Sequence, residues 1–146
     1  MKYLLSHSMA KNIMLSLLLI SFVGCTGVKL IADKDSKMYD ETINAGKQVD
    51  SFYTKLLEKK SSKREYQKYS DQYLKIETEL REIYTKNNSK SLNDESTKIS
   101  KSILGLWLKY KAKHQLENQY SSGNAKLDKD RFVRLFASAL NAESSK

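Results

Sequence analysis

The sequence predicts an all-α protein: an antiparallel three-helix bundle with a short fourth C-terminal helix, preceded by a cleaved signal segment. Two features of the composition favour helices, because the 146 residues include no proline and only five glycines. These are the residues that most disfavour a helix interior. Apolar residues also recur at spacings of three and four over long stretches, which is the period of an amphipathic helix. Short polar turns separate these stretches, so neighbouring helices should run antiparallel.

A first helix is predicted from about Ser36 to Lys60. Gly46 lies on its apolar stripe and costs up to about 1 kcal/mol of helix propensity. This glycine either permits a close helix crossing or is simply tolerated. The stripe consists of Tyr39, Ile43, Gly46, Val49, Tyr53 and Leu56.

A second helix is predicted from about Lys63 to Lys86, after a capping box formed by Ser62 and Glu65. Its apolar positions have the alternating spacing of coiled-coil-like packing. Three tyrosines on this stripe favour a packed core, with a groove for a peptide or glycan as the alternative. The stripe consists of Tyr66, Tyr69, Tyr73, Ile76, Leu80 and Ile83.

A third helix should begin after Ser91 or Asn93, either of which can act as its N-cap, and run to about Tyr120. Its middle is apolar nearly all round, so we expect it to be the most buried segment. Gly123 is suited to a left-handed C-cap for this helix.

The short fourth helix is predicted over about Lys129 to Asn141, with Asp128 as its N-cap. Residues 142–146 should form a disordered tail. The bundle domain therefore covers residues 38–141 in this prediction.

The N-terminal stretch has the pattern of a secretory signal. Lys2 and Lys11 are its only charged residues, and an apolar run from Ile13 to Val23 follows them. This run has about half the roughly 20 apolar residues that a membrane-spanning helix needs. Met9 is an alternative start and gives a more compact signal.

Gly24-Cys25 at the end of this run resembles the lipobox of bacterial lipoproteins. The resemblance implies removal of residues 1–24 and lipidation of Cys25, the only cysteine in the chain. Phe22 departs from the family, in which an aliphatic residue is usual. Thr26 follows the cysteine, at the position where the family's signal for retention in the inner membrane is usually aspartate. The resemblance therefore implies sorting to the outer membrane, facing the periplasm. The alternative is an ordinary signal peptide, or a short membrane-buried helix, with an unrelated cysteine.

Residues 25–37 would then form the lipidated cysteine and a membrane tether. About a dozen extended residues reach roughly 40 Å, so the domain should lie close to its membrane. Three acyl chains would make the attachment permanent, because each buried methylene adds about 0.8 kcal/mol of membrane affinity. A lipidated Cys25 would leave no thiol for chemistry.

The chain has a net charge of +9, which falls to about +7 when Lys2 and Lys11 leave with the signal. Such charge suits an anionic membrane or an acidic partner, or reflects a lysine-rich solvated surface. Nucleic acid is not expected in the envelope. Trp107, Lys109, Lys111 and Lys113 form a possible binding surface for anionic lipid or lipopolysaccharide phosphate. The alternative is a buried tryptophan with lysines covering its edge.

The sequence shows no catalytic set, so we expect no enzyme, no metal, no cofactor and no small-molecule substrate. His114 is the only histidine after residue 24, and we interpret it as a surface or capping residue. Glu77, Glu79 and Glu82 are interpreted as solvated ion pairs rather than paired carboxylates for glycoside cleavage.

The sequence therefore favours a lipid-anchored envelope protein that acts by binding an envelope protein partner. It would belong to a secretion, conjugation or toxin-immunity system. The alternatives are a lipoprotein that binds an anionic surface or glycan through a basic helix face and, less favoured, a cell-wall hydrolase.

Overall fold

Four long helices and two short 3-10 helices make up the part of the chain that the computed structural model describes, residues 31–146. These residues form a helical bundle, which confirms the predicted fold class. The predicted signal segment, Cys25 and the first part of the tether lie outside the described residues. The elements are α2 (Ser36–Leu57), η1 (Ser61–Lys63), η2 (Tyr66–Tyr69), α3 (Ser70–Ser89), α4 (Asp94–Glu117) and α5 (Ser122–Ser144).

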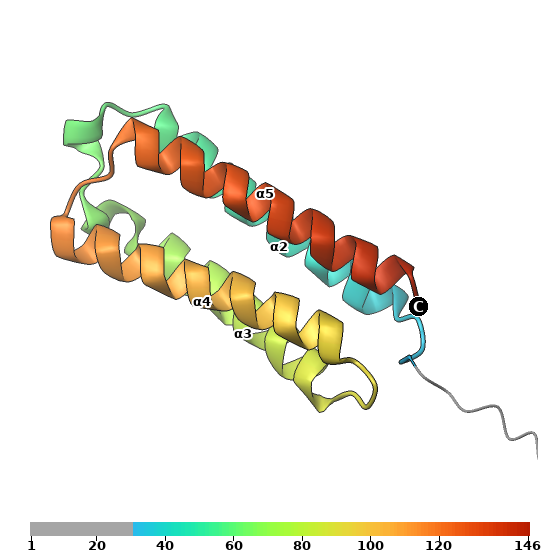
Figure 1. The fold of residues 1–146 in the computed structure, drawn as a ribbon. Helices are drawn as coiled ribbons and strands as arrows, with labels where there is room; N and C mark the ends of the chain where they lie inside the picture. Colours follow the sequence, from blue (N-terminus) through green and yellow to red (C-terminus); the bar gives the residue numbers. More distant parts are fainter. Residues whose placement is uncertain (1–30) are drawn as a thin grey trace, which may run out of the picture. The chain divides into compact units, whose positions relative to one another are not determined.

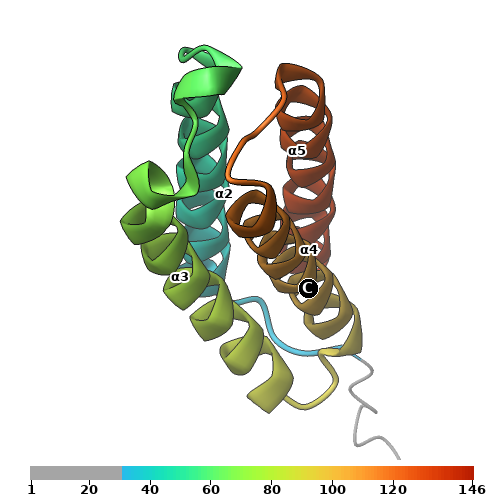
Figure 2. The ribbon, with the colours of Figure 1, turned by 90° about the vertical axis from the view of Figure 1, so that its left-hand side faces the viewer.

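Each long helix runs antiparallel to the next one along the chain (Figure 1). The two most extensive contacts join α2 to α5 and α3 to α4, while α4 also packs on α5 and α2 on α3. The four helices therefore close into a ring, which Figure 2 shows obliquely, with α3 and α2 on one side and α4 and α5 on the other. The α2–α3 and α4–α5 turns lie at one end of the bundle, and the α3–α4 turn lies at the other end (Figure 1).

The fourth helix is a full member of the bundle, and the prediction of a short helix was wrong. α5 has 23 residues, and the side chain of Ser121 caps it by accepting a hydrogen bond from the Asn124 N–H at 3.1 Å. Asp128, the predicted cap, lies inside the helix and is buried. Gly123 lies in the first turn of α5 rather than at the end of α4. The C-cap of α4 is Asn118, whose φ of 48° is left-handed, a conformation that asparagine tolerates.

The start of α3 also differs from its prediction. The capping box at Ser62 and Glu65 does not form, and two 3-10 helices precede α3, which begins at Ser70. The reason is tertiary, because Arg64 between the two turns is buried with 2% of its surface exposed. Arg64 has a non-helical backbone, with φ −106° and ψ 48°, and from there its guanidinium donates to the Lys59 and Tyr120 carbonyls.

Both ends of the described chain are more ordered than predicted. The tail expected to be disordered is helical to Ser144, and Glu143 is buried with 2% exposure. On the other side, the Ala32 N–H donates to the Leu92 carbonyl at 3.1 Å. Asp35 caps α2 by accepting from the Met38 N–H at 3.0 Å. The last residues of the predicted tether therefore belong to the fold.

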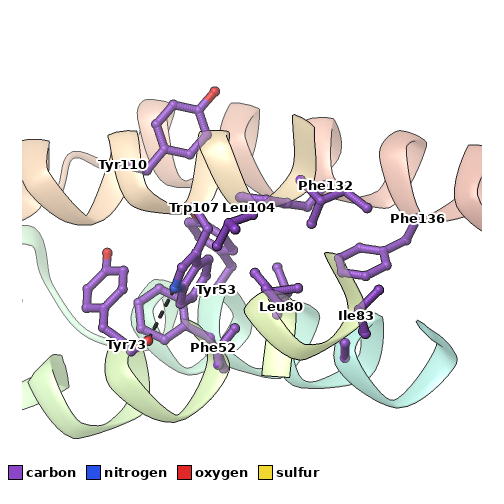
Figure 3. Close-up of a cluster of buried hydrophobic side chains, with 14 of the residues drawn as sticks. Phe52, Tyr53, Tyr73, Leu80, Ile83, Leu104, Trp107, Tyr110, Phe132 and Phe136 are labelled. Atoms are coloured by element: carbon purple, nitrogen blue, oxygen red, sulfur yellow. Dashed lines mark hydrogen bonds between the residues drawn. The ribbon is translucent and has the colours of Figure 1, made fainter. Parts of the chain in front are cut away.

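Aromatic side chains from all four helices fill the centre of the bundle around Trp107 (Figure 3). Trp107 is fully buried, and its indole N–H donates to the Tyr73 carbonyl at 3.2 Å. The ring centroids of Phe52 and Tyr73 lie 5.1 and 5.0 Å from that of Trp107. Tyr69 and Tyr73 are buried too, so the tyrosine stripe packs in the core as predicted, and the alternative of an open groove lined by it is wrong.

Candidate functional site

The predicted binding surface on α4 is not a single surface. Trp107 is fully buried, as the alternative interpretation of a buried tryptophan predicted, so it offers no surface to a ligand. The Lys111 ammonium lies 2.8 Å from the carboxylate of Glu77. Lys109 and Lys113 are exposed, and Lys113 lies 3.9 Å from the Glu117 carboxylate. Only Lys109 and Lys113 remain available to a ligand at this face.

Glu77 is less solvated than the sequence suggested. Only 9% of its surface is exposed, and it accepts hydrogen bonds from Arg81 at 2.9 Å and Lys111 at 2.8 Å. Burial alone would raise the pKa of Glu77, but the hydrogen bonds from these two cations outweigh it and hold the pKa below its usual value. This carboxylate joins α3 to α4 and is not poised to exchange a proton.

His114 is buried with 1% exposure, so its interpretation as a surface residue was wrong. Its Nε2 lies 2.6 Å from the Arg64 carbonyl and its Nδ1 lies 3.1 Å from the Tyr73 hydroxyl. Because a carbonyl only accepts, Nε2 carries the proton and Nδ1 accepts from tyrosine. Burial lowers the pKa of His114 and raises that of Tyr73. Both imidazole nitrogens are therefore engaged in a neutral structural link.

Arg64 ties together the two turns at one end of the bundle. Its guanidinium donates to the Lys59 carbonyl at 2.9 Å, the Tyr120 carbonyl at 2.8 Å and the Ser122 hydroxyl at 3.1 Å. No carboxylate pairs with it among residues 31–146, so backbone carbonyls near the C-terminal end of α2 hold the charge. Sequence reasoning missed this residue, because one arginine in a lysine-rich turn has no signature of burial.

We call this end of the bundle, residues 58–69 and 113–127, the basic tip. The Tyr66 N–H donates to the Asn118 side chain at 3.0 Å, which adds a second link between its turns. Leu116 protrudes with 88% of its surface exposed and Leu127 with 46%. The exposed lysines of the basic tip are Lys59, Lys60, Lys63, Lys68, Lys113 and Lys126.

An open apolar groove of about 340 Å³ runs between α2 and α5, and we call it the α2–α5 groove. The two helices approach closely at Gly46, where an added Cβ would lie 3.2 Å from Cγ of Phe136. This contact supports the close crossing rather than a merely tolerated glycine. The salt bridge between Lys129 and Asp50, at 3.1 Å, lies beside the groove. The apolar lining includes Ile43, Val49, Phe132, Val133, Ala137 and Leu140.

A second, enclosed space lies inside the bundle near the C-terminal end of α5. It measures about 10 Å³, which is room for one water molecule. Ser96 Oγ and Glu143 Oε2 are buried beside it without a hydrogen-bond partner. The other carboxylate oxygen of Glu143 lies 2.7 Å from the Lys146 ammonium. The cavity is too small for any larger ligand.

Residues 31–146 contain no group of three histidine, cysteine or acidic side chains placed to hold a metal ion. Within the same range, none of the helices combines the length and the hydropathy required to span a bilayer. No protein-family model, no curated protein and no solved structure matches the chain. Function is therefore to be sought on the surfaces of the described bundle, among them the α2–α5 groove and the basic tip.

Proposed function

We propose that this chain is a bacterial envelope lipoprotein, anchored through Cys25 in the outer membrane and facing the periplasm, that acts by binding another envelope protein. The α2–α5 groove carries the proposal, because it is an open hollow lined mainly by apolar side chains. The open hollow beside it, between α2 and α3, is lined mainly by polar side chains such as Glu41, Gln48 and Glu79. The partner supplies an amphipathic helix whose apolar side chains enter the groove. A place in a secretion, conjugation or toxin-immunity assembly fits such a role.

The groove has the chemistry of a helix-binding site. Val133 is 53% exposed at its edge, and apolar side chains of both helices line it. Fully burying an aliphatic side chain is worth roughly 1.5–3 kcal/mol, so a few anchors at helical spacing give a stable contact. The charged pair of Lys129 and Asp50 beside the groove can fix the direction of the bound helix, since each charge prefers the opposite sign on the partner.

Binding is favoured over catalysis by the state of the reactive side chains. His114 uses both ring nitrogens inside the core. Glu77, one of the acidic residues considered for glycoside cleavage, is held by Arg81 and Lys111. We therefore do not propose a cell-wall hydrolase.

The lipid anchor is tested by the intact mass of the mature protein from the membrane fraction, with Cys25→Ser as the control. The expected result is a chain that begins at Cys25 and carries the mass of three acyl chains. A full-length chain, or an unmodified chain in the soluble fraction, would refute the anchor.

The groove is tested by placing a photo-crosslinking amino acid at Val133, with Leu74 on α3 as the matched control. Leu74 is 60% exposed and lies outside the groove. We expect an adduct of defined mass from position 133 in intact cells, and loss of this adduct when Ala137→Asp places a charge in the groove. Equal crosslinking from positions 133 and 74 would count against the groove as the binding site.

A second candidate function, binding to an anionic surface, keeps the support of one observation. Exposed lysines gather at one end of the bundle rather than along the face of α4 that the sequence indicated.

A further inference from the structure

The basic tip concentrates positive charge at one end of the bundle. Residues 58–68 hold five basic side chains against two acidic ones, Glu58 and Glu65. Residues 33–41, at the opposite end, hold four acidic side chains against two lysines. The positive charge is therefore not spread evenly over a solvated surface.

The charges of the basic tip are largely free. Within the described chain, no carboxylate forms a salt bridge with Lys59, Lys60, Lys63 or Lys126. Two tip lysines do have such partners, since Lys68 pairs with Glu65 and Lys113 with Glu117. The sole arginine of the tip, Arg64, is turned inward. The cations without a salt bridge are therefore lysines, each a flexible point charge. They lack the planar guanidinium with which arginine binds both oxygens of a carboxylate.

An exposed leucine lies among these charges. Leu116 is 88% exposed in the last turn of α4. Lys109 and Lys113 precede it by seven and three residues, so all three side chains share one face of the helix. Leu127, 46% exposed, lies in the first turns of α5 at the same end. Lysines around a protruding apolar side chain are the composition of surfaces that bind bilayers.

We infer that the basic tip is a docking surface for a bilayer rich in anionic phospholipid. The lysines contact headgroup phosphates, and Leu116 enters the boundary between headgroups and acyl chains. A fluid headgroup layer accommodates flexible lysines and a protruding leucine without a shaped pocket. An acidic protein partner would have to provide such a pocket for the leucine. Arg64 supports this surface by holding its two turns together.

The basic tip is remote from the end at which the described chain begins. α2 has 22 residues and is about 33 Å long at 1.5 Å per residue. Electrostatic attraction decays over about 8–10 Å at moderate salt. Docking at the tip develops the second candidate function above, and it depends neither on a lipid at Cys25 nor on a partner in the α2–α5 groove.

The test is cosedimentation of residues 31–146, which contain the whole described core, with vesicles of phosphatidylcholine alone or mixed with phosphatidylglycerol. We expect binding to the anionic vesicles only, with an affinity that falls as salt rises. Each lysine near an anionic surface contributes about 1 kcal/mol, or roughly fivefold in affinity. The triple variant Lys59→Gln, Lys60→Gln, Lys63→Gln should therefore bind about 100-fold more weakly.

The matched control is the triple variant Lys34→Gln, Lys37→Gln, Lys98→Gln. These three lysines are exposed at the opposite end, and the variant changes the net charge by the same amount as the tip variant. It should remain within about threefold of the unmodified protein. Leu116→Ser should weaken binding by about tenfold, the equivalent of losing a buried leucine.

Leu92→Ser, at an exposed leucine in the α3–α4 turn at the opposite end, should have no effect on vesicle binding. Circular dichroism checks that each variant remains folded.

Three outcomes would overturn the inference. They are equal binding to neutral and anionic vesicles, equal losses in the two triple variants, and binding to soluble polyglutamate with no binding to anionic vesicles. The last outcome would assign the basic tip to an acidic protein partner instead.

Discussion

Replacing Arg64 by methionine should destabilise the bundle more than any single change at an exposed residue. The guanidinium donates to the Lys59 and Tyr120 carbonyls and to the Ser122 hydroxyl. Methionine fills much of the same volume but donates nothing. The Tyr120 carbonyl, in a buried bond, and the Lys59 carbonyl, in a partly buried one, are then left without their charged donor.

The magnitude follows from these contacts. A hydrogen bond from a charged group contributes about 1.5–3 kcal/mol, so the two carbonyl bonds together represent about 3–6 kcal/mol. Part of this is offset, because methionine removes a buried charge that has no carboxylate partner. We expect a net loss of about 2–4 kcal/mol in the free energy of unfolding, a large share of the roughly 5–15 kcal/mol typical of a domain.

The assay is urea unfolding followed by the fluorescence of Trp107, the only tryptophan in the chain. The midpoint should fall while the slope m stays unchanged, since the surface exposed on unfolding is the same. Arg64→Lys should recover part of the loss, because one ammonium cannot reach all the partners that the planar fork serves. Lys63→Met, an exposed neighbour, should change stability by less than about 0.5 kcal/mol. If Arg64→Met is as mild as Lys63→Met, the two turns are held by other contacts and the reasoning fails.

Three further predictions concern His114, two glycines within helices, and Trp107. Burial lowers the pKa of His114 below its usual 6.5, so the unfolded chain binds the proton at a higher pH than the folded chain does. Stability should therefore fall as the pH drops through about 6.5 towards the folded pKa. Thermal melts at pH 5 to 8 should show this fall, and His114→Gln should remove it. Gly105→Ala, with nothing within 4 Å of the added Cβ, should raise stability by about 1 kcal/mol. Gly46→Ala should gain less, because the Phe136 ring must move, and equal gains in urea midpoints would contradict the close crossing. Trp107→Ala should cost about 3–5 kcal/mol in urea unfolding followed by circular dichroism, because this change removes the only tryptophan fluorophore. A loss under 1 kcal/mol would show that the core does not depend on this ring.

Periodicity predicted the parts of the fold that depend on local pattern. The spacing of apolar residues located α2, the core stripe of α3 and the body of α4 to within a few residues. It failed for the first turns of α5, where Ala125 is the one apolar residue that is buried before Phe132. Burial of an alanine leaves almost no periodic signal, and the capping role of Ser121 depends on a turn that the sequence does not specify.

Burial of polar residues was the other limit. The sequence does not show whether Arg64, His114 and Glu77 are solvated or buried. Their burial depends on partners that are far away in the chain. The α2–α5 groove was also invisible, because its two sides, around Gly46 and Phe136, are about 90 residues apart. Cys25, the one site that the sequence placed by motif, stays a prediction because it lies outside the described residues.

The packing of α2 against α5 has a consequence for how the protein is made. The first and last helices of the described chain are each other's main partner, so α2 completes the burial of its apolar stripe only when α5 is present. A chain that ends before Ser122 lacks α5 and, with it, the Phe132 ring that packs on Tyr53. We expect such a chain not to reach the packed state of the bundle. For a protein directed by a signal of the kind proposed here, a fold that waits for α5 favours the extended polypeptide that a translocation channel requires.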